Sequence, residues 1–236
     1  MDRNNGKKIL IVDDNKSIRK TVADYLSIRG YEVLQAEDGI RGLDSGLSSD
    51  ANVIILDVVM PGIDGVRLCK LLREKGVTTP IIMLTEKAGI RDKEAGYEVG
   101  VDDYLAKPFS PRELELRIEA LQKRAHQTDK TPDQKILKRG DMEIDLNKHL
   151  VKIDGKNIVL TPIEFNILQL LASAPGQVYT RQDLLNAIWD TAYEGYKRNI
   201  DPHVNRLRTK IETHPKRPKY VLTVWGVGYK FNDSLT

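Results

Sequence analysis

Cysteine is almost absent from this sequence: Cys69 is the only one in 236 residues, so no disulfide can form within the chain. Such scarcity is typical of a reducing compartment. Long apolar runs are also missing, and none could cross a bilayer. Met1–Lys8 leads into only four apolar residues before two acids, which does not make a signal-peptide core. These absences favour a soluble, cytoplasmic protein that does not contact a membrane.

Aromatic residues are few, at 6%, but 40% of the residues are apolar, which is enough for real hydrophobic cores. A chain of this length forms one large domain or two modest ones, and the charge pattern favours two. Residues 1–125 hold 20 basic and 21 acidic residues, a net charge of −1, whereas residues 126–236 hold 17 and 13, a net charge of +4. Residues 126–135 lack apolar side chains and are predicted to link domains at 1–125 and 136–236.

Short aliphatic runs alternate with amphipathic segments throughout the first domain. This alternation of strands and helices predicts an α/β fold, a doubly wound (βα)5 domain whose parallel sheet has helices on both faces. The predicted helices lie at 17–29, 39–47, 65–75, 92–99 and 111–124.

The second domain has a different order of elements. The predicted order is strands at 142–146 and 150–153, a helix starting at Thr161, helices at 181–189 and 198–212, and a hairpin at 220–231. The first of these helices opens with a capping box, Thr161 to Glu164, and is expected to bury Phe165, Leu168 and Leu171. Helix, turn, basic helix and hairpin in this order predict an α+β winged-helix domain.

Asp57 stands within the apolar run 53–60, which is predicted to be a strand buried on both faces. A buried carboxylate must be neutralised, paired or bound to a metal, because an isolated buried charge is very costly. Other apolar runs also end in polar residues, namely Asp13 and Asp14 after 9–12, Thr85 after 81–84 and Lys107 after 104–106. Since the carboxyl ends of parallel strands share one edge, these groups can converge on Asp57. Three acids, a hydroxyl and an ammonium suit phosphate and metal chemistry.

The segment from Gly195 to Tyr220 carries eight basic and two acidic residues. A charge run of this kind is most often a solvated surface. Its position near the end of a separate, basic domain favours the other interpretation, a nucleic-acid-binding face.

Several motifs occur in an order and spacing that resemble one known family. They are Ile11-Val12-Asp13-Asp14, Leu56-Asp57 with Met60–Gly65, Leu84-Thr85, Asp102–Phe109, Arg198–Arg208 and Gly226–Tyr229. Residues 1–125 resemble a receiver domain, and the whole chain resembles a bacterial response regulator of the OmpR/PhoB winged-helix family. The resemblance implies a two-component transcriptional regulator, not an enzyme. Its implied partners are a sensor histidine kinase, double-stranded promoter DNA, RNA polymerase and a second copy of the chain.

The same resemblance implies that Asp57 accepts the phosphoryl group and that Mg²⁺ is the cofactor. Magnesium takes about six oxygen ligands, some of them water, and offsets charge between a carboxylate and an incoming phosphoryl group. Asp14, Asp57 and the carbonyl of Val59 are the implied protein ligands, and Asp13 is implied to act through water.

Three further residues of the first domain have implied roles. Lys107 would contact the phosphoryl oxygens, the Thr85 hydroxyl would bond to one of them, and Tyr104 would turn inward on phosphorylation. Taken singly, Thr85 could be an ordinary strand-end hydroxyl and Lys107 a surface lysine. The Lys107-Pro108 peptide bond is expected to be cis by the same resemblance.

Charged residues on one face of the receiver match the positions through which family receivers pair as symmetric dimers. The implied partners across the dimer are Lys93 with Glu113, Asp103 with Arg117, and Asp102 with Arg124. The alternative is an ordinary solvated surface, since exposed ion pairs contribute only about 0 to 1 kcal/mol each.

In the second domain, Arg206 corresponds to the family position that reaches bases, and a bidentate contact with guanine is the expected one. Phosphate contacts are expected from Arg198, His203, Arg208 and Lys210. His203 could instead be a satisfied helix histidine. Trp189 matches a backbone-contacting tryptophan but could equally belong to the core.

Three residues depart from the family pattern. Pro202 lies where the recognition helix usually has an apolar residue, so that helix is expected to start at Asp201 as its cap. Trp225 replaces an arginine that enters the minor groove, and is expected to contact the DNA at the groove edge. Glu86 follows Thr85 where a small residue is usual, which puts bulk and negative charge beside the site.

Two rival functions can be weighed from the residues. An aspartyl-phosphate hydrolase of the haloacid dehalogenase type needs a second acid two residues after its nucleophile, and that position is Val59. The other rival is a DNA-binding regulator controlled without phosphorylation. The five site residues argue against it, whereas Glu86 keeps it open.

Overall fold

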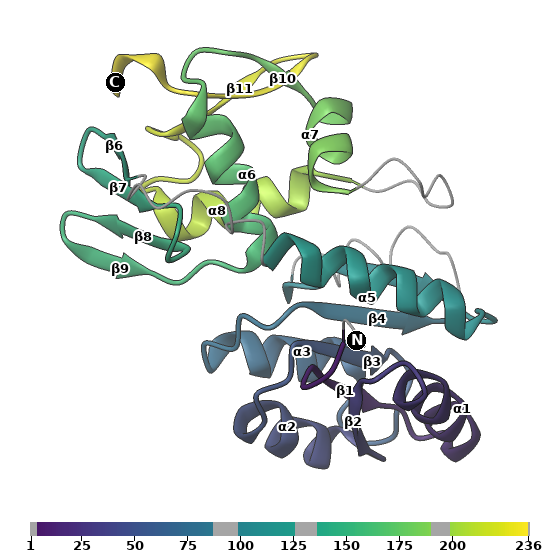
Figure 1. Cartoon of the computed structure of the whole chain (residues 1–236). Coiled ribbons are helices and arrows are strands. Elements are labelled where there is room, and N and C mark those ends of the chain that lie inside the picture. Colours follow the sequence, from purple (N-terminus) through teal and green to yellow (C-terminus); the bar gives the residue numbers. More distant parts are fainter. Residues whose placement is uncertain (1–3, 87–98, 126–135, 190–198, 236) are drawn as a thin grey trace. The chain divides into compact units, whose positions relative to one another are not determined.

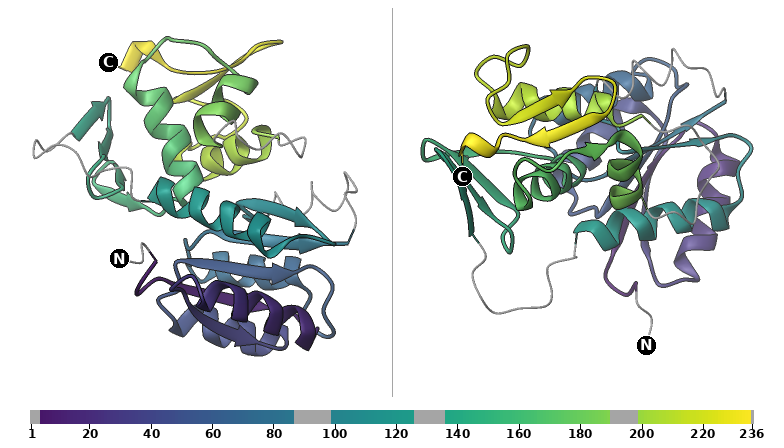
Figure 2. Two further views of the ribbon diagram at one scale, coloured as in Figure 1. Left: turned by 45° about the vertical axis from the view of Figure 1, so that its right-hand side comes forward. Right: turned by 90° about the horizontal axis from the view of Figure 1, so that it is seen from above.

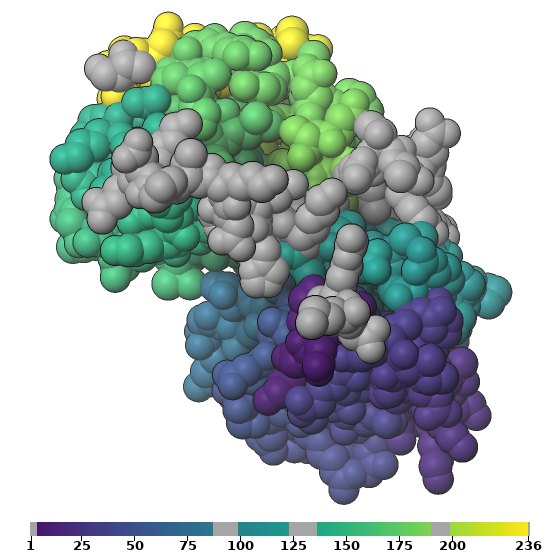
Figure 3. Space-filling view, in the orientation of Figure 1, coloured from purple at the N-terminus to yellow at the C-terminus, as the bar shows by residue number. Residues whose placement is uncertain are grey.

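The computed structural model describes residues 4–86, 99–125, 136–189 and 199–235. The chain divides into two compact units, Met1–Lys123 and Arg124–Thr236, each with its own core. Figure 3 shows one face of the described residues in colour. The predicted linker at 126–135 lies outside the described residues, as does nearly all of the predicted helix at 92–99. None of the described helices is long and apolar enough to span a membrane.

The first unit contains a five-stranded sheet in the order β2-β1-β3-β4-β5, with every neighbouring pair parallel (Figure 1). Its strands are β1 (Lys8–Val12), β2 (Glu32–Ala36), β3 (Val53–Asp57), β4 (Ile81–Thr85) and β5 (Asp103–Ala106). The strands β1, β3 and β4 are almost wholly buried aliphatic residues, as expected when both faces are covered. The predicted doubly wound α/β fold is confirmed.

Helices cover both faces of this sheet, α1 and α5 on one and α2 and α3 on the other (Figure 2). They are α1 (Lys16–Ser27), α2 (Gly39–Ser48), α3 (Gly65–Glu74) and α5 (Pro111–Ala125). The N-caps of the first three are Asn15, Asp38 and Asp64, whose side chains accept hydrogen bonds from backbone N–H groups that the first turn leaves unpaired.

The predicted strand at 53–60 is too long. The strand β3 ends at Asp57, because the backbone then turns: the N–H of Gly65 donates to the carbonyl of Val58. Asp57 therefore lies at the end of its strand, where its side chain can face the sheet edge.

The described part of the second unit has two small antiparallel sheets and three α-helices (Figure 1). One sheet is β6 (Ile136–Arg139), β7 (Met142–Asp145), β8 (Leu150–Ile153) and β9 (Lys156–Ile158), and the other has the order β10 (Tyr179–Thr180), β12 (Gly228–Phe231), β11 (Val221–Val224). The helices are α6 (Pro162–Ser173), α7 (Arg181–Ile188) and α8 (Asp201–Ile211), and a 3-10 turn lies at Asp233–Leu235. The predicted winged-helix arrangement is confirmed.

The helix α6 forms the centre of this unit. Thr161 and Glu164 make the predicted capping box, and Phe165, Leu168 and Leu171 are buried as expected. Burying each such side chain contributes about 1.5 to 3 kcal/mol, so this apolar face holds α6 against its neighbours.

The start of α8 differs in one detail from the prediction. Pro202 does occupy the first turn, where a missing N–H is harmless, but the N-cap is Ile200 rather than Asp201. The Asp201 carboxylate does not cap, because it accepts hydrogen bonds from Arg181 Nε at 2.8 Å and from the Tyr229 hydroxyl at 2.9 Å.

Candidate functional site

Three carboxylates meet at the carboxyl edge of the parallel sheet in the first unit. Asp13 and Asp14 follow β1, and Asp57 ends β3, the strand that pairs with β1. One oxygen from each of the three lies within 4.8 Å of the others. The chain reverses its direction of winding between β1 and β3, which is where crevices form in open α/β sheets. Carboxylate oxygens at this spacing suit a hard divalent cation.

Lys107 places its ammonium group among these acids. Its Nζ lies 3.0 Å from Asp13 Oδ2 and 2.9 Å from Asp57 Oδ2. The Lys107-Pro108 peptide bond is cis, as predicted, and the N–H of Lys107 donates to the carbonyl of Thr85 at 2.7 Å. Burial alone would lower the pKa of Lys107, but its hydrogen bonds to Asp57 and Asp13 raise it. The lysine therefore stays charged and offsets part of the acidic charge.

Asp57 differs from Asp13 in how its oxygens are used. Asp13 is fully buried, and its Oδ1 accepts the N–H of Asn15 at 2.8 Å while Oδ2 accepts from Lys107. The Oδ1 of Asp57 is buried and has no hydrogen-bond partner within the described part of the chain. Burial raises the pKa of Asp57, Asp13 raises it further, and Lys107 and the Val59 backbone oppose the rise. Among the described residues, Asp57 thus keeps one oxygen, Oδ1, without a hydrogen-bond partner.

The loop after Asp57 is held close to it by a glycine. A Cβ on Gly65 would lie 2.0 Å from the carbonyl oxygen of Asp57, so only glycine permits this approach. The approach places the start of α3 against the backbone of Asp57. Val59 is 63% exposed. Its predicted role is that of a magnesium ligand, and this role involves its backbone carbonyl and not its side chain.

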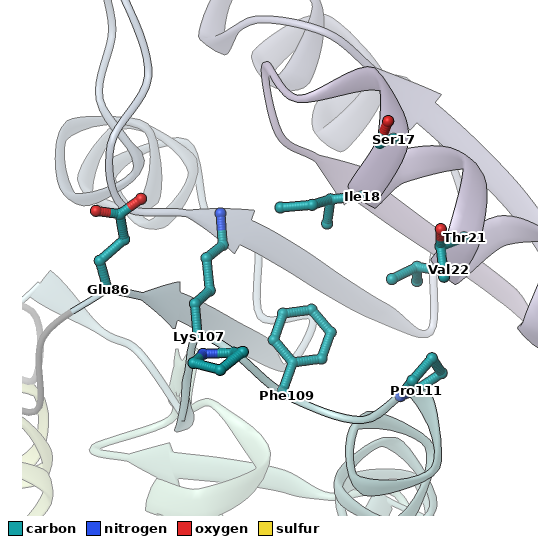
Figure 4. Close-up of a pocket in the computed structure, with 9 residues that line it drawn as sticks. Ser17, Ile18, Thr21, Val22, Glu86, Lys107, Phe109 and Pro111 are labelled. Carbon is teal, nitrogen blue, oxygen red and sulfur yellow. The ribbon is translucent and has the colours of Figure 1, made fainter.

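A cleft of about 570 Å³ opens beside Lys107. Its walls come from the first half of α1 and from the loop between β5 and α5 (Figure 4). Ile18 and Phe109 face each other across it, and Glu86 extends in the same direction as Lys107. Glu86 is exposed, so its charge stands at the mouth of the site as the sequence suggested.

The two predicted switch residues are both buried. Thr85 ends β4 and is 5% exposed, and Tyr104 on β5 is 4% exposed and packs in the main core with Met83. The tyrosine is therefore already turned inward in this structure.

The predicted dimer residues are partly committed within the chain. Arg117 is buried and lies 2.8 Å from Asp103 and 3.1 Å from Glu113 of the same chain. Asp102 is 1% exposed and accepts hydrogen bonds from Arg73 and from the N–H of Ile81, both at 2.8 Å. The prediction that Asp102 presents a charge to a partner conflicts with this burial. Lys93 and the side chain of Arg124 lie outside the described residues.

Two predicted phosphate contacts of the second unit are also buried. His203 has no exposed surface, and burial lowers its pKa well below 6.5, with the nearby charge of Arg206 adding to the effect. Arg208 is 8% exposed and donates from Nε and Nη2 to the carbonyl of Val221, at 3.0 and 2.7 Å. We therefore remove both residues from the predicted DNA contacts. The imidazole of His203 is buried and neutral, and the guanidinium of Arg208 is hydrogen-bonded to β11, so neither can hold a phosphate.

The remaining predicted DNA contacts differ in exposure. Lys210 and Trp225 are exposed, the latter by 89%. Arg206 has only 13% of its side chain exposed and donates to Glu164. Arg198 lies outside the described residues, and Trp189 is buried at 4% and belongs to the core.

Comparison with known proteins assigns both units. A family model for the response regulator receiver domain matches residues 9–119, and one for the C-terminal part of transcriptional regulatory proteins matches residues 155–231. A crystal structure of DrrB, a Thermotoga maritima OmpR/PhoB homolog, is 34% identical, covers 96% of this chain and 99% of its own, and superimposes with a TM-score of 0.50. This chain belongs to the OmpR/PhoB family of response regulators.

Full-length relatives of this response regulator agree. The transcriptional regulatory protein ResD of Bacillus subtilis is 44% identical over 236 residues, 98% of each chain. The alkaline phosphatase synthesis transcriptional regulatory protein PhoP of the same organism is 38% identical and covers 96% of this chain and 97% of its own. The regulator therefore pairs a receiver domain with a DNA-binding domain, and its receiver has the acidic pocket in which such domains bind Mg²⁺.

Sequence reasoning missed what Glu164 does beyond capping. Its carboxylate is 1% exposed and lies 3.3 Å from Arg206 Nε and 2.7 Å from Lys210 Nζ. No local sequence signal shows this second role, because which acid lies opposite Arg206 and Lys210 depends on how α6 packs against α8.

Proposed function

We propose that this response regulator accepts a phosphoryl group on Asp57 from a sensor histidine kinase and binds promoter DNA in response. The observation that carries the proposal is the buried Oδ1 of Asp57, which has no hydrogen-bond partner among the described residues and lies on a carboxylate beside the ammonium of Lys107. That oxygen would form the new bond to phosphorus as the bond from phosphorus to the donor's nitrogen breaks, and the imidazole would leave.

The neighbouring residues supply binding and charge. Asp14 and Asp57, with the carbonyl of Val59, would hold Mg²⁺, and Asp13 would act through water. When bound, the ion would neutralise charge on the phosphoryl oxygens. Lys107 is already beside the acceptor and would pair with one of those oxygens. Thr85 would donate its hydroxyl to another.

The output is proposed to be a shift in assembly and DNA binding. Movement of Thr85 towards the phosphoryl group would bias the packing around Tyr104 and favour a homodimer. The partly exposed Glu113 supports this surface, and Lys93 is its proposed partner. Lys210 and Trp225 are proposed DNA contacts because both are exposed, and RNA polymerase is the proposed downstream partner.

Intact-mass measurement tests the acceptor. The protein is incubated with phosphoramidate and Mg²⁺, and the parent should gain one phosphoryl group that Asp57→Asn does not gain. Chelation of the metal should abolish the gain, and Asp14→Asn should raise the concentration of Mg²⁺ required. Equal incorporation in Asp57→Asn would refute the assignment.

A further inference from the structure

Only a few side chains of α8 are exposed to solvent. His203, Val204, Leu207, Arg208 and Ile211 are buried. Asn205, Thr209 and Lys210 are exposed. Residues 205 and 209 are four apart, so they lie one above the other on the same face of the helix. If α8 enters a major groove, this is the face that meets the base edges.

Arg206 is not free to join that face. Its Nε donates to Glu164 Oε1 at 3.3 Å, and its Nη2 lies 2.8 Å from His203 Nδ1. Glu164 also accepts the N–H of Thr161 at 2.9 Å and pairs with Lys210. Withdrawing Arg206 towards DNA would take a cation away from a carboxylate that is 1% exposed, and such buried charges are costly to leave without their partner.

We propose that Asn205 is the base-reading residue of α8 and that it selects adenine. This inference rests on the proposed function, namely that the second unit binds DNA. A carboxamide has a donor and an acceptor in the geometry that matches N7 and the N6 amino group of adenine in the major groove. Within the described residues, the Asn205 side chain makes no hydrogen bond that would compete, and the Thr209 hydroxyl bonds to its backbone carbonyl rather than to its carboxamide.

Thr209 completes the reading face. Its hydroxyl donates to the carbonyl of Asn205 at 3.0 Å, which leaves its methyl group for contact. A methyl group suits the C5-methyl of thymine, so Asn205 and Thr209 together favour A·T pairs at adjacent positions of each half-site. Arg206 becomes a positioning residue: through Glu164 it fixes the helix that presents Asn205.

Selection from a random duplex library by the full-length, phosphoramidate-treated protein provides the test. The parent should enrich a motif with an adenine in each half-site. Replacing that adenine with 7-deazaadenine, which lacks the N7 acceptor, should weaken binding by about 5- to 150-fold. Asn205→Ala should be indifferent to the replacement and should accept any base at that position, with its melting temperature unchanged.

Arg206→Met separates reading from positioning. It should lower the melting temperature of the second unit and weaken all sequences alike, while the adenine stays in the selected motif. The proposal is overturned if Asn205→Ala enriches the parental motif unchanged, or if Arg206→Met loses one specific base with no fall in melting temperature. A parent that binds no duplex at all would instead refute the proposed function, and the adenine assignment with it.

Discussion

Asp57 in the receiver and Glu164 in the DNA-binding unit are two nearly enclosed carboxylates that lie beside basic side chains. They are 4% and 1% exposed. Glu164 uses both oxygens, since Oε1 accepts from Arg206 and Oε2 accepts from Lys210 and from the N–H of Thr161. Asp57 uses one oxygen, with Lys107, and leaves the other without a partner among the described residues.

The two acids differ in hydrogen bonding: Glu164 has partners on both oxygens, whereas Asp57, the proposed acceptor, has one oxygen without a partner among the described residues. A satisfied buried carboxylate stabilises the fold around it, and its loss leaves cations unpaired. A buried carboxylate with an open oxygen is kept at a cost in stability, which is typical of functional sites. The two acids are alike in burial and in the charge around them. What distinguishes them is whether the second carboxylate oxygen has a hydrogen-bond partner among the described residues.

Removing the Glu164 carboxylate should destabilise its unit, whereas removing the Asp57 carboxylate should not. Glu164→Ala should lower the free energy of unfolding of the second unit by about 3 kcal/mol, because it leaves Arg206 and Lys210 without their acid and removes a helix cap. Urea unfolding followed by tryptophan fluorescence reports that unit, which contains both tryptophans, Trp189 and Trp225.

Asp57→Asn is the matched change in the receiver. It should leave the receiver's unfolding, followed by far-ultraviolet circular dichroism without Mg²⁺, unchanged or slightly more favourable to the folded state. The reason is that burial raises the pKa of Asp57, so its ionised form is disfavoured by folding. A marked loss of stability in Asp57→Asn would erase the distinction between the two acids.

Acid should weaken the second unit through His203. Its folded pKa is lowered well below 6.5, by burial first and by Arg206 second, whereas the unfolded value stays near 6.5. Below about pH 6.5 the unfolded chain binds a proton on His203 that the folded chain does not bind. The free energy of unfolding therefore falls as the pH falls, by up to about 2 kcal/mol at pH 5. Fluorescence-detected urea unfolding at pH 7.5 and 5 measures the loss of stability between the two pH values. This loss should be smaller in His203→Phe than in the parent. In His214→Gln, a change at an exposed position, it should equal that of the parent.

Trp225 tests whether the exposed wing acts by contact or by charge. Trp225→Ala should weaken DNA binding by about 1 kcal/mol with the same salt dependence, since an indole displaces no counterions. Trp225→Arg should steepen the plot of log affinity against log salt by about one unit. Binding isotherms at several salt concentrations measure both, and a shallower slope in Trp225→Ala would contradict a neutral contact.

Glu86 should give the smallest effect. Its exposed carboxylate repels an anionic donor at the mouth of the site, so Glu86→Ala should speed phosphorylation by acetyl phosphate about two- to fivefold at low salt. The gain should shrink at high salt, because exposed charges are screened. Glu74→Ala, another exposed acid on the receiver, is the control and should leave the rate unchanged.

The receiver was easier to predict from sequence than the DNA-binding face, for a physical reason. Strand-end residues are fixed by chain position: once a parallel sheet forms, Asp13, Asp57 and Lys107 must share an edge, and they do. On α8 the outcome depends on rotation about the helix axis and on which acid lies opposite. A basic stripe shows neither, so Arg208 and His203 were placed outside when packing puts them inside.

Smaller misses have the same origin. The length of β3 and the cap of α8 depended on contacts made by distant residues, a backbone bond from Gly65 in one case and the pairing of Asp201 with Arg181 in the other. The capping box at Thr161 was predictable because its partners are three residues apart.

The most direct test of the account is DNA binding by the parent and by Asp57→Asn, each with and without phosphoramidate and Mg²⁺. A duplex selected by the phosphorylated parent serves as the probe. The account predicts that phosphodonor tightens binding by the parent about 5- to 150-fold, the range of typical coupling free energies of 1 to 3 kcal/mol, and leaves Asp57→Asn unaffected. Equal affinity of the parent with and without phosphodonor, at confirmed phosphoryl content, would contradict it and favour control without phosphorylation.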